Sequence, residues 1–534
     1  MAPPSHSHAT NGSGAPHSQN NGAIAVDTPV TQCARLLDAD EFRRHGHLVV
    51  DFIADYYAGL GEYPVHPTVS PGFLRHHLPA EAPSSRTEPA DAFAAALQDV
   101  RDVILPGLTH WQSPRHFAHF PASSSTVGAL GEALTTGINV VPFTWAASPA
   151  ATELEMVVVD WLGKALHLPE RMLFAGGGGG TILGTTCEAI LCALVAARDR
   201  KLTVIGEERI GDLVVYCSDQ THFAFCKAAC ITGIQRDHCS EIPTYRDDTF
   251  ALSPAELQAA MQRDVDAGLV PLFLCATIGT TQTTAVDTVG ELCAVAAPHG
   301  AWVHVDAAYA GSALVCPEFR GVIAGGVEAA DSFSMNAHKW LLANNDCCVM
   351  WVRTPSALVA ALGTDQEYIL KDAAAATAAE GVVDYKDWGV TLTRRFRALK
   401  VWLVLRCYGV EGLREHVRSH VRMAAAFEGM VRADARFEVV TPRRFALVCF
   451  RLRSPKNYRS AGGEKSANEL NRRLLEEVNA ASSGPYMSSG MVGGVYMLRC
   501  AVGSTLTEER HVREAWKVVQ DRATSILRKM EIIM

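Results

Sequence analysis

The sequence has no run of about 18 apolar residues, the length that a membrane-spanning helix requires. Its first residues do not show the charged and then apolar order of a secretory signal. The 15 cysteines are scattered without the spacing of a metal site, and their odd number does not suit a disulfide framework. From these absences we expect a cytoplasmic protein with reduced thiols, no membrane span and no bound metal.

Positive charge is also scarce, since 48 Lys and Arg stand against 57 Asp and Glu and give a net charge of -9. An acidic chain is poorly suited to nucleic acid or to an anionic membrane, so we expect neither as a partner. Hydrophobic residues make up 48% of the chain and charged residues 20%, as in a globular protein.

Residues 1–35 are rich in Ser, His, Asn, Gly, Ala and Pro, which predicts a disordered tail because little apolar surface can be buried. Residues 36–109 predict two helices, one running from residue 36 past Ile53 and one over 89–105, each with a single apolar face. An apolar face left in water predicts that this segment packs against a partner.

From residue 110 to 393, apolar runs alternate with helical patterns, which predicts an α/β domain with a parallel sheet between helices. The expected strands include 212–217, 270–276 and 302–305, and the expected helices include 254–267 and 289–299.

Residues 394–534 predict a smaller C-terminal α+β domain that follows a long helix over 396–408. Its expected strands are 437–440, 446–450 and 495–499, and the polar, glycine-containing segment 458–465 predicts a surface loop.

Lys339 stands between His338 and Trp340, just ahead of an apolar Leu-Leu pair. Loss of water disfavours an ammonium group, so a lysine in such surroundings has a lowered pKa. A neutral amine is what imine formation with an aldehyde requires. Taken alone, the segment is equally compatible with a solvated lysine in a turn.

Asp306 follows a short apolar run, which predicts a buried parallel strand with this carboxylate at its carboxyl end. A buried carboxylate needs a cationic partner. The protonated ring nitrogen of pyridoxal 5'-phosphate (PLP) is such a partner, and an aspartate there keeps the ring an electron sink. A carboxylate that merely caps a turn would not explain a candidate imine lysine nearby.

Residues 304–311, His-Val-Asp-Ala-Ala-Tyr-Ala-Gly, and 336–342, Asn-Ala-His-Lys-Trp-Leu-Leu, resemble the signature segments of the group II PLP-dependent amino-acid decarboxylases. The resemblance extends from about residue 36 to the C-terminus and is strongest to the plant aromatic L-amino-acid decarboxylases of the tyrosine decarboxylase type. It implies fold type I of the PLP-dependent transferases, with an N-terminal helical dimerisation segment and a homodimer with shared active sites.

The resemblance also implies a carboxy-lyase that converts L-tyrosine and L-DOPA to tyramine and dopamine. Three alternatives stay open, namely a tryptophan or 5-hydroxytryptophan decarboxylase, an aromatic acetaldehyde synthase and a catalytically inactive PLP-binding paralogue.

A segment over 176–189 opens with five glycines and leads into a predicted helix over 190–197, and glycines let backbone amides approach an anion closely. A flexible loop is the ordinary alternative, but beside the lysine and aspartate we expect this segment to hold the cofactor phosphate. The resemblance assigns cofactor contacts to Thr186, Cys187, Thr281, Asn336 and His338.

His222 follows a predicted strand within Ser-Asp-Gln-Thr-His. A lone histidine is more often structural, but the resembling family stacks this imidazole on the cofactor ring, where it assists protonation. The family assignment makes His222, Lys339 and Asp306 catalytic candidates.

Two aromatic segments, 117–125 and 142–145, resemble the family's substrate wall and give His119, Pro121, Phe143 and Trp145 as substrate-binding candidates. His119 stands where related enzymes usually have tyrosine or phenylalanine, and an imidazole there is able to hydrogen-bond a phenol. Thr393 stands where the resembling enzymes carry glycine for indolic substrates and serine for phenolic ones. Its hydroxyl and methyl take up space that an indole would need, which favours tyrosine and DOPA.

Tyr368 lies in a segment near 362–383 that predicts a mobile catalytic loop, since it includes a low-complexity alanine stretch. In the resembling family, the loop tyrosine reaches the other subunit's active site and returns a proton after carbon dioxide leaves. Related aldehyde-forming enzymes carry phenylalanine there, so Tyr368 favours simple decarboxylation.

Overall fold

The computed structural model describes residues 36–84, 89–323, 325–364, 383–454, 456–481 and 484–533. The predicted tail over 1–35 and the catalytic candidate Tyr368 lie outside the described residues. The chain divides into two compact units, one of Met1–Asp55 and Pro83–Gln98 and one of Tyr56–Ala82 and Asp99–Met534. The described helices include none that is both long and apolar enough to cross a membrane.

The first unit contains most of helix α1 (Ala39–Gly59) and of α3 (Pro89–Asp99), in agreement with the two predicted helices. Asp38 starts α1, because its carboxylate accepts hydrogen bonds from the backbone amides of Asp40 and Glu41 at 3.0 and 2.9 Å. The rings of His45 and Phe93 stack at 4.4 Å and join the two helices.

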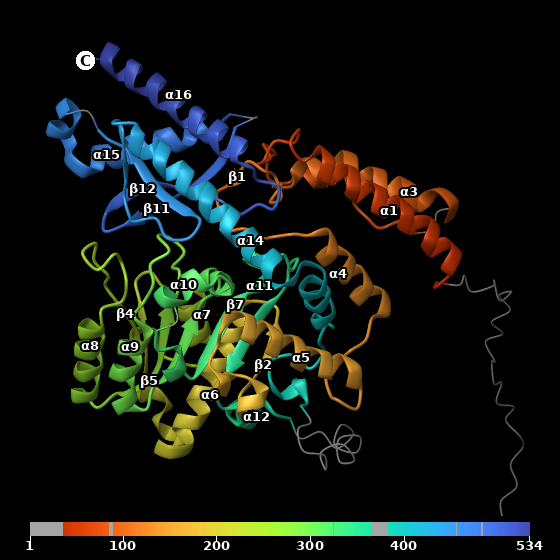
Figure 1. Cartoon of the computed structure of the whole chain (residues 1–534), viewed down its shortest axis with the longest axis vertical. Coiled ribbons are helices and arrows are strands. Elements are labelled where there is room, and N and C mark those ends of the chain that lie inside the picture. Colours follow the sequence, from red (N-terminus) through yellow and green to blue (C-terminus); the bar gives the residue numbers. More distant parts are fainter. Residues whose placement is uncertain are drawn as a thin grey trace, which may run out of the picture. The chain divides into compact units, whose positions relative to one another are not determined.

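The second unit has a seven-stranded sheet in the order β2-β8-β7-β6-β5-β3-β4 (Figure 1). The strands are β2 (Gly179–Leu183), β3 (Leu213–Ser218), β4 (Cys239–Ile242), β5 (Val270–Thr277), β6 (Trp302–Asp306), β7 (Ser332–Asn336) and β8 (Cys348–Val352). The five strands from β7 to β4 are parallel, as predicted, whereas β8 runs antiparallel to both of its neighbours.

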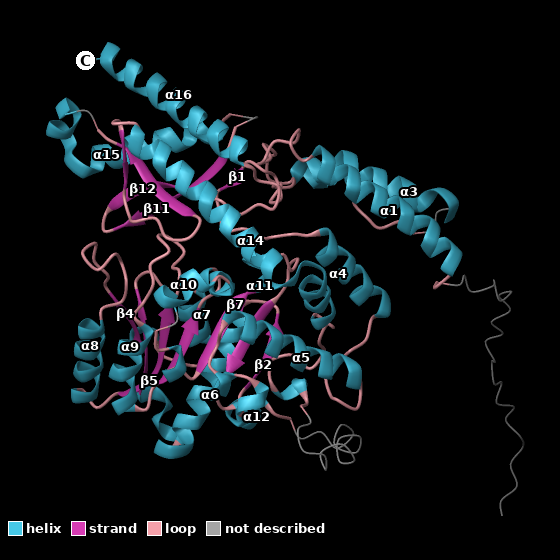
Figure 2. Ribbon diagram, viewed as in Figure 1, coloured by secondary structure: helices cyan, strands magenta, loops and turns pink. Residues whose placement is uncertain are grey.

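Helices cover both faces of this sheet (Figure 2), because successive side chains of each buried strand point to opposite faces. In β3, Val214 and Tyr216 pack into one apolar cluster with α5 (Pro149–Leu166), α8 (Pro254–Asp266) and α9 (Val289–Ala296). Val215 and Cys217 pack into a second cluster with α6 (Thr186–Ile205), α7 (Ala224–Ile231) and α12 (Pro355–Leu362). The predicted α/β architecture is therefore confirmed.

A second sheet has the order β1-β11-β12-β10-β9. Its strands are β1 (His116–Phe117), β9 (Phe437–Val439), β10 (Leu447–Leu452), β11 (Tyr486–Val492) and β12 (Val495–Ala501), and its helices are α14 (Ala398–Ala433), α15 (Lys456–Asn479) and α16 (Glu509–Ile533). The predicted C-terminal strands are present, and β1 adds a short parallel pairing with β11. The predicted helix over 396–408 overlaps α14 from Ala398 onward, and the helical backbone of α14 is interrupted at Gly409 (φ 62°, ψ 174°).

The prediction of a surface loop over 458–465 is wrong, because these residues belong to α15. The later part of α15 buries Ala467, Leu470, Leu474 and Val478, which recur at helical spacing and anchor the helix. The polar segment precedes this anchored part, and its glycine content is accommodated by a break at Gly463 (φ 56°, ψ -138°).

Candidate active site

Lys339 lies in the short helix α11 (Ala337–Trp340), directly after strand β7. Its neighbour Trp340 is fully buried, stacks on Tyr309 at 4.8 Å and donates a hydrogen bond to His420 Nδ1 at 2.9 Å. These contacts fix the backbone on which Lys339 is mounted. Burial lowers the pKa of the Lys339 ammonium group, while the carboxylate of Asp306 acts in the opposite direction.

Asp306 ends strand β6 and is 3% exposed, as the sequence predicted for a carboxylate at a buried strand end. Its Oδ1 accepts a hydrogen bond from the Ala308 amide at 3.0 Å. Burial raises the pKa of this carboxyl, and the nearby Lys339 and His222 lower it. The mutual effects on pKa show that Asp306, Lys339 and His222 lie close enough to form one electrostatic group.

His222 lies in the turn between β3 and α7 and is partly buried. Its Nδ1 accepts a hydrogen bond from the Ala224 amide at 3.2 Å, so in the neutral ring the proton is on Nε2. Burial is the main cause that lowers the pKa of His222, and Lys339 adds to it. The neutral imidazole can therefore donate a hydrogen bond from Nε2.

Thr186 begins helix α6, and its hydroxyl donates a hydrogen bond to Asn336 Oδ1 at 2.8 Å. The preceding Thr185 caps the helix by accepting a hydrogen bond from the Glu188 amide. Cys187 is exposed in the first turn and influences the pKa of Lys339. Three predicted cofactor contacts, Thr186, Cys187 and Asn336, thus gather near a helix N-terminus, which favours an anion.

Most of the glycines over 176–180 are closely packed and do not form an open loop. Gly179 and Gly180 belong to the buried strand β2, and a Cβ on Gly180 would lie 2.5 Å from the Met350 carbonyl oxygen. A Cβ on Gly176 or Gly178 would lie 2.2 Å from a carbonyl oxygen of Glu170 or Arg171. These glycines permit close packing of backbone, and the part of the segment that is suited to an anion is the start of α6.

His338 is buried, and its Nδ1 accepts a hydrogen bond from the Cys347 amide at 2.8 Å. Its carbonyl oxygen accepts from the Ser123 amide at 2.7 Å. Burial lowers the pKa of His338 to about 4, so the ring is neutral at physiological pH. His338 therefore joins α11 to the chain segments on both sides of it.

The substrate candidates lie on segments held by distant residues. Phe143 accepts a hydrogen bond at its carbonyl from the Lys386 amide at 2.8 Å, and Trp145 donates from its amide to Asp384 Oδ1 at 2.8 Å. Pro121 is buried against Gly503, where a Cβ would lie 2.5 Å from the proline ring.

His119 is exposed, and its ring lies 5.2 Å from Trp111, 5.7 Å from His116 and 6.3 Å from Tyr486. The structure thus places His119 in a group of aromatic rings. The neighbouring protein atoms shield part of the His119 ring from water and lower its pKa, and the charge of Arg499 adds to this effect.

Thr281 is held through its carbonyl oxygen, which accepts a hydrogen bond from Arg499 Nη2 at 2.7 Å. Arg499 is buried, lies over the Phe120 ring at 5.5 Å and also bonds the Gln282 carbonyl at 3.1 Å. The sequence analysis missed Arg499 because a single arginine in a strand gives no signal of such distant partners.

A buried ion pair adjoins Thr393 and was also missed. Arg394 donates to both carboxylate oxygens of Glu155, at 2.6 and 3.2 Å, and lies over the Tyr385 ring at 4.5 Å. Thr393 itself is exposed, so the ion pair fixes its backbone while leaving the side chain free of the core.

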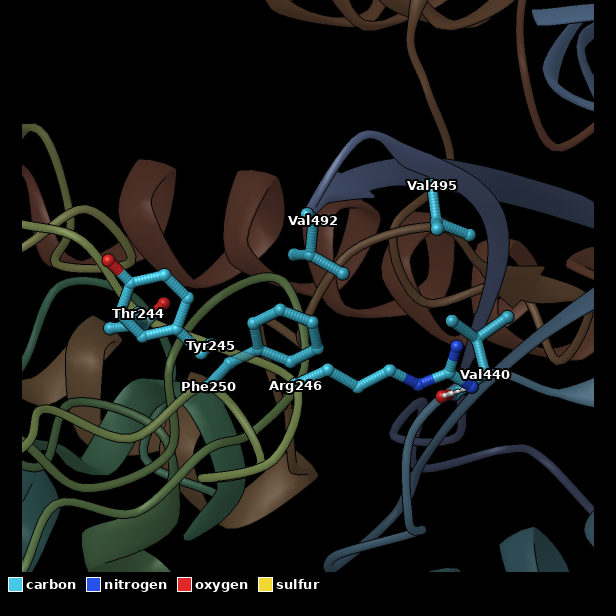
Figure 3. A pocket seen from close by; sticks show the side chains of 8 residues that line it. Thr244, Tyr245, Arg246, Phe250, Val440, Val492 and Val495 are labelled. Atoms are coloured by element: carbon cyan, nitrogen blue, oxygen red, sulfur yellow. Dashed lines mark hydrogen bonds between the residues drawn. The ribbon is translucent and has the colours of Figure 1, made fainter. Parts of the chain in front are cut away.

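A cavity of about 240 Å³ lies elsewhere in the same unit, lined by Thr244, Tyr245, Arg246, Phe250, Val440, Val492, Gly493 and Val495 (Figure 3). Apolar side chains dominate this lining, and the Arg246 guanidinium is occupied by the Val440 carbonyl at 3.3 Å. None of the predicted site residues lines this cavity, so the candidate active site is defined by the groups around Lys339.

Residues 71–453 match the pyridoxal-dependent decarboxylase conserved domain. The chain is 81% identical over 542 residues to a tyrosine decarboxylase of Oryza sativa subsp. japonica, covering 99% of this chain and 100% of the relative. It is also similar to the crystal structure of Oryza sativa TDC with PLP and tryptamine, with 47% identity, a TM-score of 0.88 and coverage of 92% and 99%. The crystal structure of Rhodiola rosea 4-hydroxyphenylacetaldehyde synthase has 48% identity, a TM-score of 0.85 and coverage of 92% and 99%.

Proposed function

Because this chain belongs to the pyridoxal-dependent decarboxylase family, we propose that it converts L-tyrosine and L-DOPA to tyramine and dopamine with release of carbon dioxide. The observation that carries this proposal is the pairing of Lys339, whose pKa is lowered by burial, with the buried Asp306 at the carboxyl edge of the sheet. The name of the 81% identical rice relative supports tyrosine as the substrate.

The cofactor of this fold type I enzyme is PLP, and the residues present fit it. Asp306 offers a buried carboxylate for the ring nitrogen, and the Lys339 amine is suited to the aldehyde. Thr186, Cys187 and Asn336 offer polar groups near the N-terminus of α6 for the phosphate. When bound, PLP supplies the electron sink that allows the bond to carbon dioxide to break.

The chain's own residues prepare the reaction by controlling protons. Burial lowers the pKa of Lys339, which favours the neutral amine that attack on an aldehyde requires. The Nε2 proton of His222 is suited to hold the substrate carboxylate or to assist a proton donor, because its Nδ1 is occupied by the Ala224 amide. Thr281 and His338 act as further cofactor contacts in this proposal.

The proposal assigns the return of a proton to Tyr368 of the 362–383 segment, acting in the partner's active site. We expect Tyr368→Phe to change the product, because the carbon that lost carbon dioxide then lacks its proton donor. Molecular oxygen is the oxidant in the expected side reaction, which gives aldehyde, ammonia and hydrogen peroxide in place of amine. Product identification with a peroxide assay tests this, and unaltered amine formation would move the donor to His222.

We also propose a cytoplasmic homodimer. Helix α4 (Thr126–Ile138) exposes Leu130, Leu134 and Ile138 at 57%, 50% and 55%, and their spacing places them on one face. A second copy of the chain is the partner expected to cover such a face.

We propose that residues 36–109 form a dimerisation segment, 110–393 the cofactor domain and 394–534 the small domain. Free cysteines among the described residues suit a reducing compartment.

The substrate prediction is tested by incubating the purified holoenzyme with tyrosine, DOPA, phenylalanine, tryptophan and 5-hydroxytryptophan. We expect amine from tyrosine and DOPA, because Thr393 restricts a bicyclic ring and His119 is proposed to hydrogen-bond a phenol. A site that bonds a hydroxyl can reject an analogue lacking it by up to about 10⁴–10⁵-fold. Thr393→Gly is expected to gain activity on tryptophan, and Thr391→Gly, a change at a nearby exposed threonine, is the matched control.

The same assay separates the alternatives. Faster turnover of tryptophan than of tyrosine would contradict the substrate assignment and leave decarboxylation intact. Aldehyde with hydrogen peroxide would identify a synthase, and complete inactivity of the PLP-loaded protein would identify an inactive paralogue.

A further inference from the structure

Three cysteine side chains from three elements meet on one face of the large sheet. The Sγ atoms of Cys217 in β3, Cys226 in α7 and Cys239 in β4 all lie within 4.8 Å of one another. The Cys226 and Cys239 Sγ atoms are 3.2 Å apart, and the Cys226 thiol donates to the Glu241 carboxylate at 3.2 Å. Cys217 is buried, and Cys226 and Cys239 are partly buried.

The strand register explains why these groups converge. β3 and β4 are parallel neighbours, and Cys217 pairs with Glu241. Cys239 precedes Glu241 by two positions, so both of their side chains lie on the same face as Cys217. Helix α7 packs on this face, because Phe225 and Ala228 share an apolar cluster with Cys217, and it brings Cys226 to the group.

We propose that Cys217, Cys226 and Cys239 form a binding site for one zinc ion or another borderline-soft divalent cation. Glu241, whose carboxylate contacts the Cys226 thiol, is proposed to supply the fourth ligand after a rotation of its side chain. Zinc takes three thiolates and a carboxylate in a tetrahedral arrangement with Zn–S distances of about 2.3 Å, which separates the sulfur atoms by about 3.8 Å. The three sulfur atoms lie within 4.8 Å of one another, so small movements bring them to this spacing. Binding would move Cys226 and Cys239 apart by about half an ångström.

A metal ion binds the thiolate form of cysteine, so binding of a cation at this cluster would release the thiol protons of its ligands.

The position of the cluster gives it a consequence for the active site. Cys217 and Cys226 stand on either side of the turn that carries His222, and Cys217 immediately precedes Ser218 at the end of β3. A cation bound to both would hold this turn from its two ends. His222 would then be positioned in part by a cation that takes no part in the reaction.

The test is cation binding to the purified holoenzyme under anaerobic, reducing conditions. After equilibration with zinc and removal of free ion, elemental analysis is expected to find one tightly bound zinc per chain at this cluster. Cobalt in its place is expected to give the thiolate charge-transfer absorption and the intense visible bands of a tetrahedral site. The binding assay does not use turnover, so its outcome is independent of the proposed substrate.

The variants to be tested are Cys226→Ser and Cys239→Ser, because both side chains are partly exposed. Replacement of the buried Cys217 is expected to disturb folding. Each change is expected to weaken cation binding by at least about 100-fold, since loss of a ligand exceeds the effect of an outer-shell partner. Glu241→Gln is expected to weaken binding and to alter the cobalt spectrum. Cys230→Ser, an exposed cysteine of the same helix outside the cluster, is the matched control and is expected to bind like the wild type.

Three results would overturn the proposal. The first is wild-type protein that binds no zinc or cobalt under these conditions. The second is binding by Cys226→Ser and Cys239→Ser that equals binding by Cys230→Ser. The third is a Cys226–Cys239 disulfide formed under mild oxidation in a protein that binds no cation when reduced, which would identify a redox pair instead.

Discussion

Lys339→Ala is expected to abolish decarboxylation, with a loss of at least about 10⁴-fold, while the chain remains folded. The reaction needs a neutral amine at this position, and burial lowers the pKa of Lys339, which favours that form. The alanine variant keeps the fold because the anchors of α11 belong to its neighbours. Trp340 is held by Tyr309 and His420 whether or not the lysine side chain is present.

Amine formation at saturating PLP measures this effect, and thermal unfolding measures the retention of the fold. Lys164→Ala is the control, because Lys164 is an exposed lysine of α5. Borohydride reduction gives a second measurement that does not depend on turnover. An alanine variant that still formed a reducible link to PLP at one other lysine would show that Lys339 has been misassigned.

Local pattern predicted the sheet well where a strand is a short apolar run between helical patterns. The predicted strand over 270–276 lies within β5 (Val270–Thr277), and the one over 302–305 lies within β6 (Trp302–Asp306). The antiparallel direction of β8 and the pairing of β1 with β11 were not predicted. Both features depend on contacts between residues far apart in the sequence. The spacing of apolar residues along the chain gives no information on such contacts.

The same distinction applies to the candidate site. Asp306 was predictable because it ends an apolar run, and Lys339 was predictable because residues 336–342 resemble a family signature. The structure brings the two residues to one edge of the sheet because β6 and β7 are parallel neighbours. Arg394 and Glu155 stand 239 positions apart, and neither has a local pattern that marks it as buried. The cysteine cluster was missed for the same reason, since its members come from a strand, a helix and a second strand.

The glycine run shows how a local pattern can suggest a loop where the structure has close backbone packing. The sequence analysis placed the phosphate at a glycine loop and named Thr186 and Cys187 at its end. The structure uses Gly178 and Gly180 to bring backbone segments together, whereas Thr186 and Cys187 begin a 20-residue helix. The helix N-terminus, with its unpaired amides, is the physical reason to expect an anion there.

Asp306→Asn is expected to lower the rate by at least about 10²-fold and to weaken PLP binding, because a charge placed in a buried site is lost. The amide keeps nearly the same shape, and its oxygen still accepts the hydrogen bond that the Ala308 amide donates at 3.0 Å. The fold is therefore expected to tolerate the change. A neutral side chain cannot stabilise a protonated ring nitrogen, so the electron sink is weakened.

The variant should also alter Lys339. Asp306 raises the pKa of the Lys339 ammonium group, and burial lowers it. Removal of the carboxylate removes the largest effect that opposes burial, so the Lys339 pKa is expected to fall further, which favours the neutral amine at lower pH. The loss of activity in Asp306→Asn would then come from weaker stabilisation of the cofactor ring and not from protonation of Lys339. The rate of amine formation, measured against pH at saturating PLP, is therefore expected not to recover at higher pH.

Asp287→Asn is the contrasting control for this prediction. Asp287 is also buried, but its carboxylate accepts hydrogen bonds from the amides of Leu252 and Thr277 at 2.8 and 2.7 Å, one on each oxygen. An asparagine retains only one acceptor oxygen, so this change is expected to cost about 1–3 kcal/mol of unfolding free energy and to leave PLP binding intact. Asp306→Asn should show the reverse, a loss of rate and cofactor affinity with little loss of stability. Near-wild-type rates for Asp306→Asn at saturating PLP, with the same stability loss as Asp287→Asn, would show that Asp306 has a structural role only.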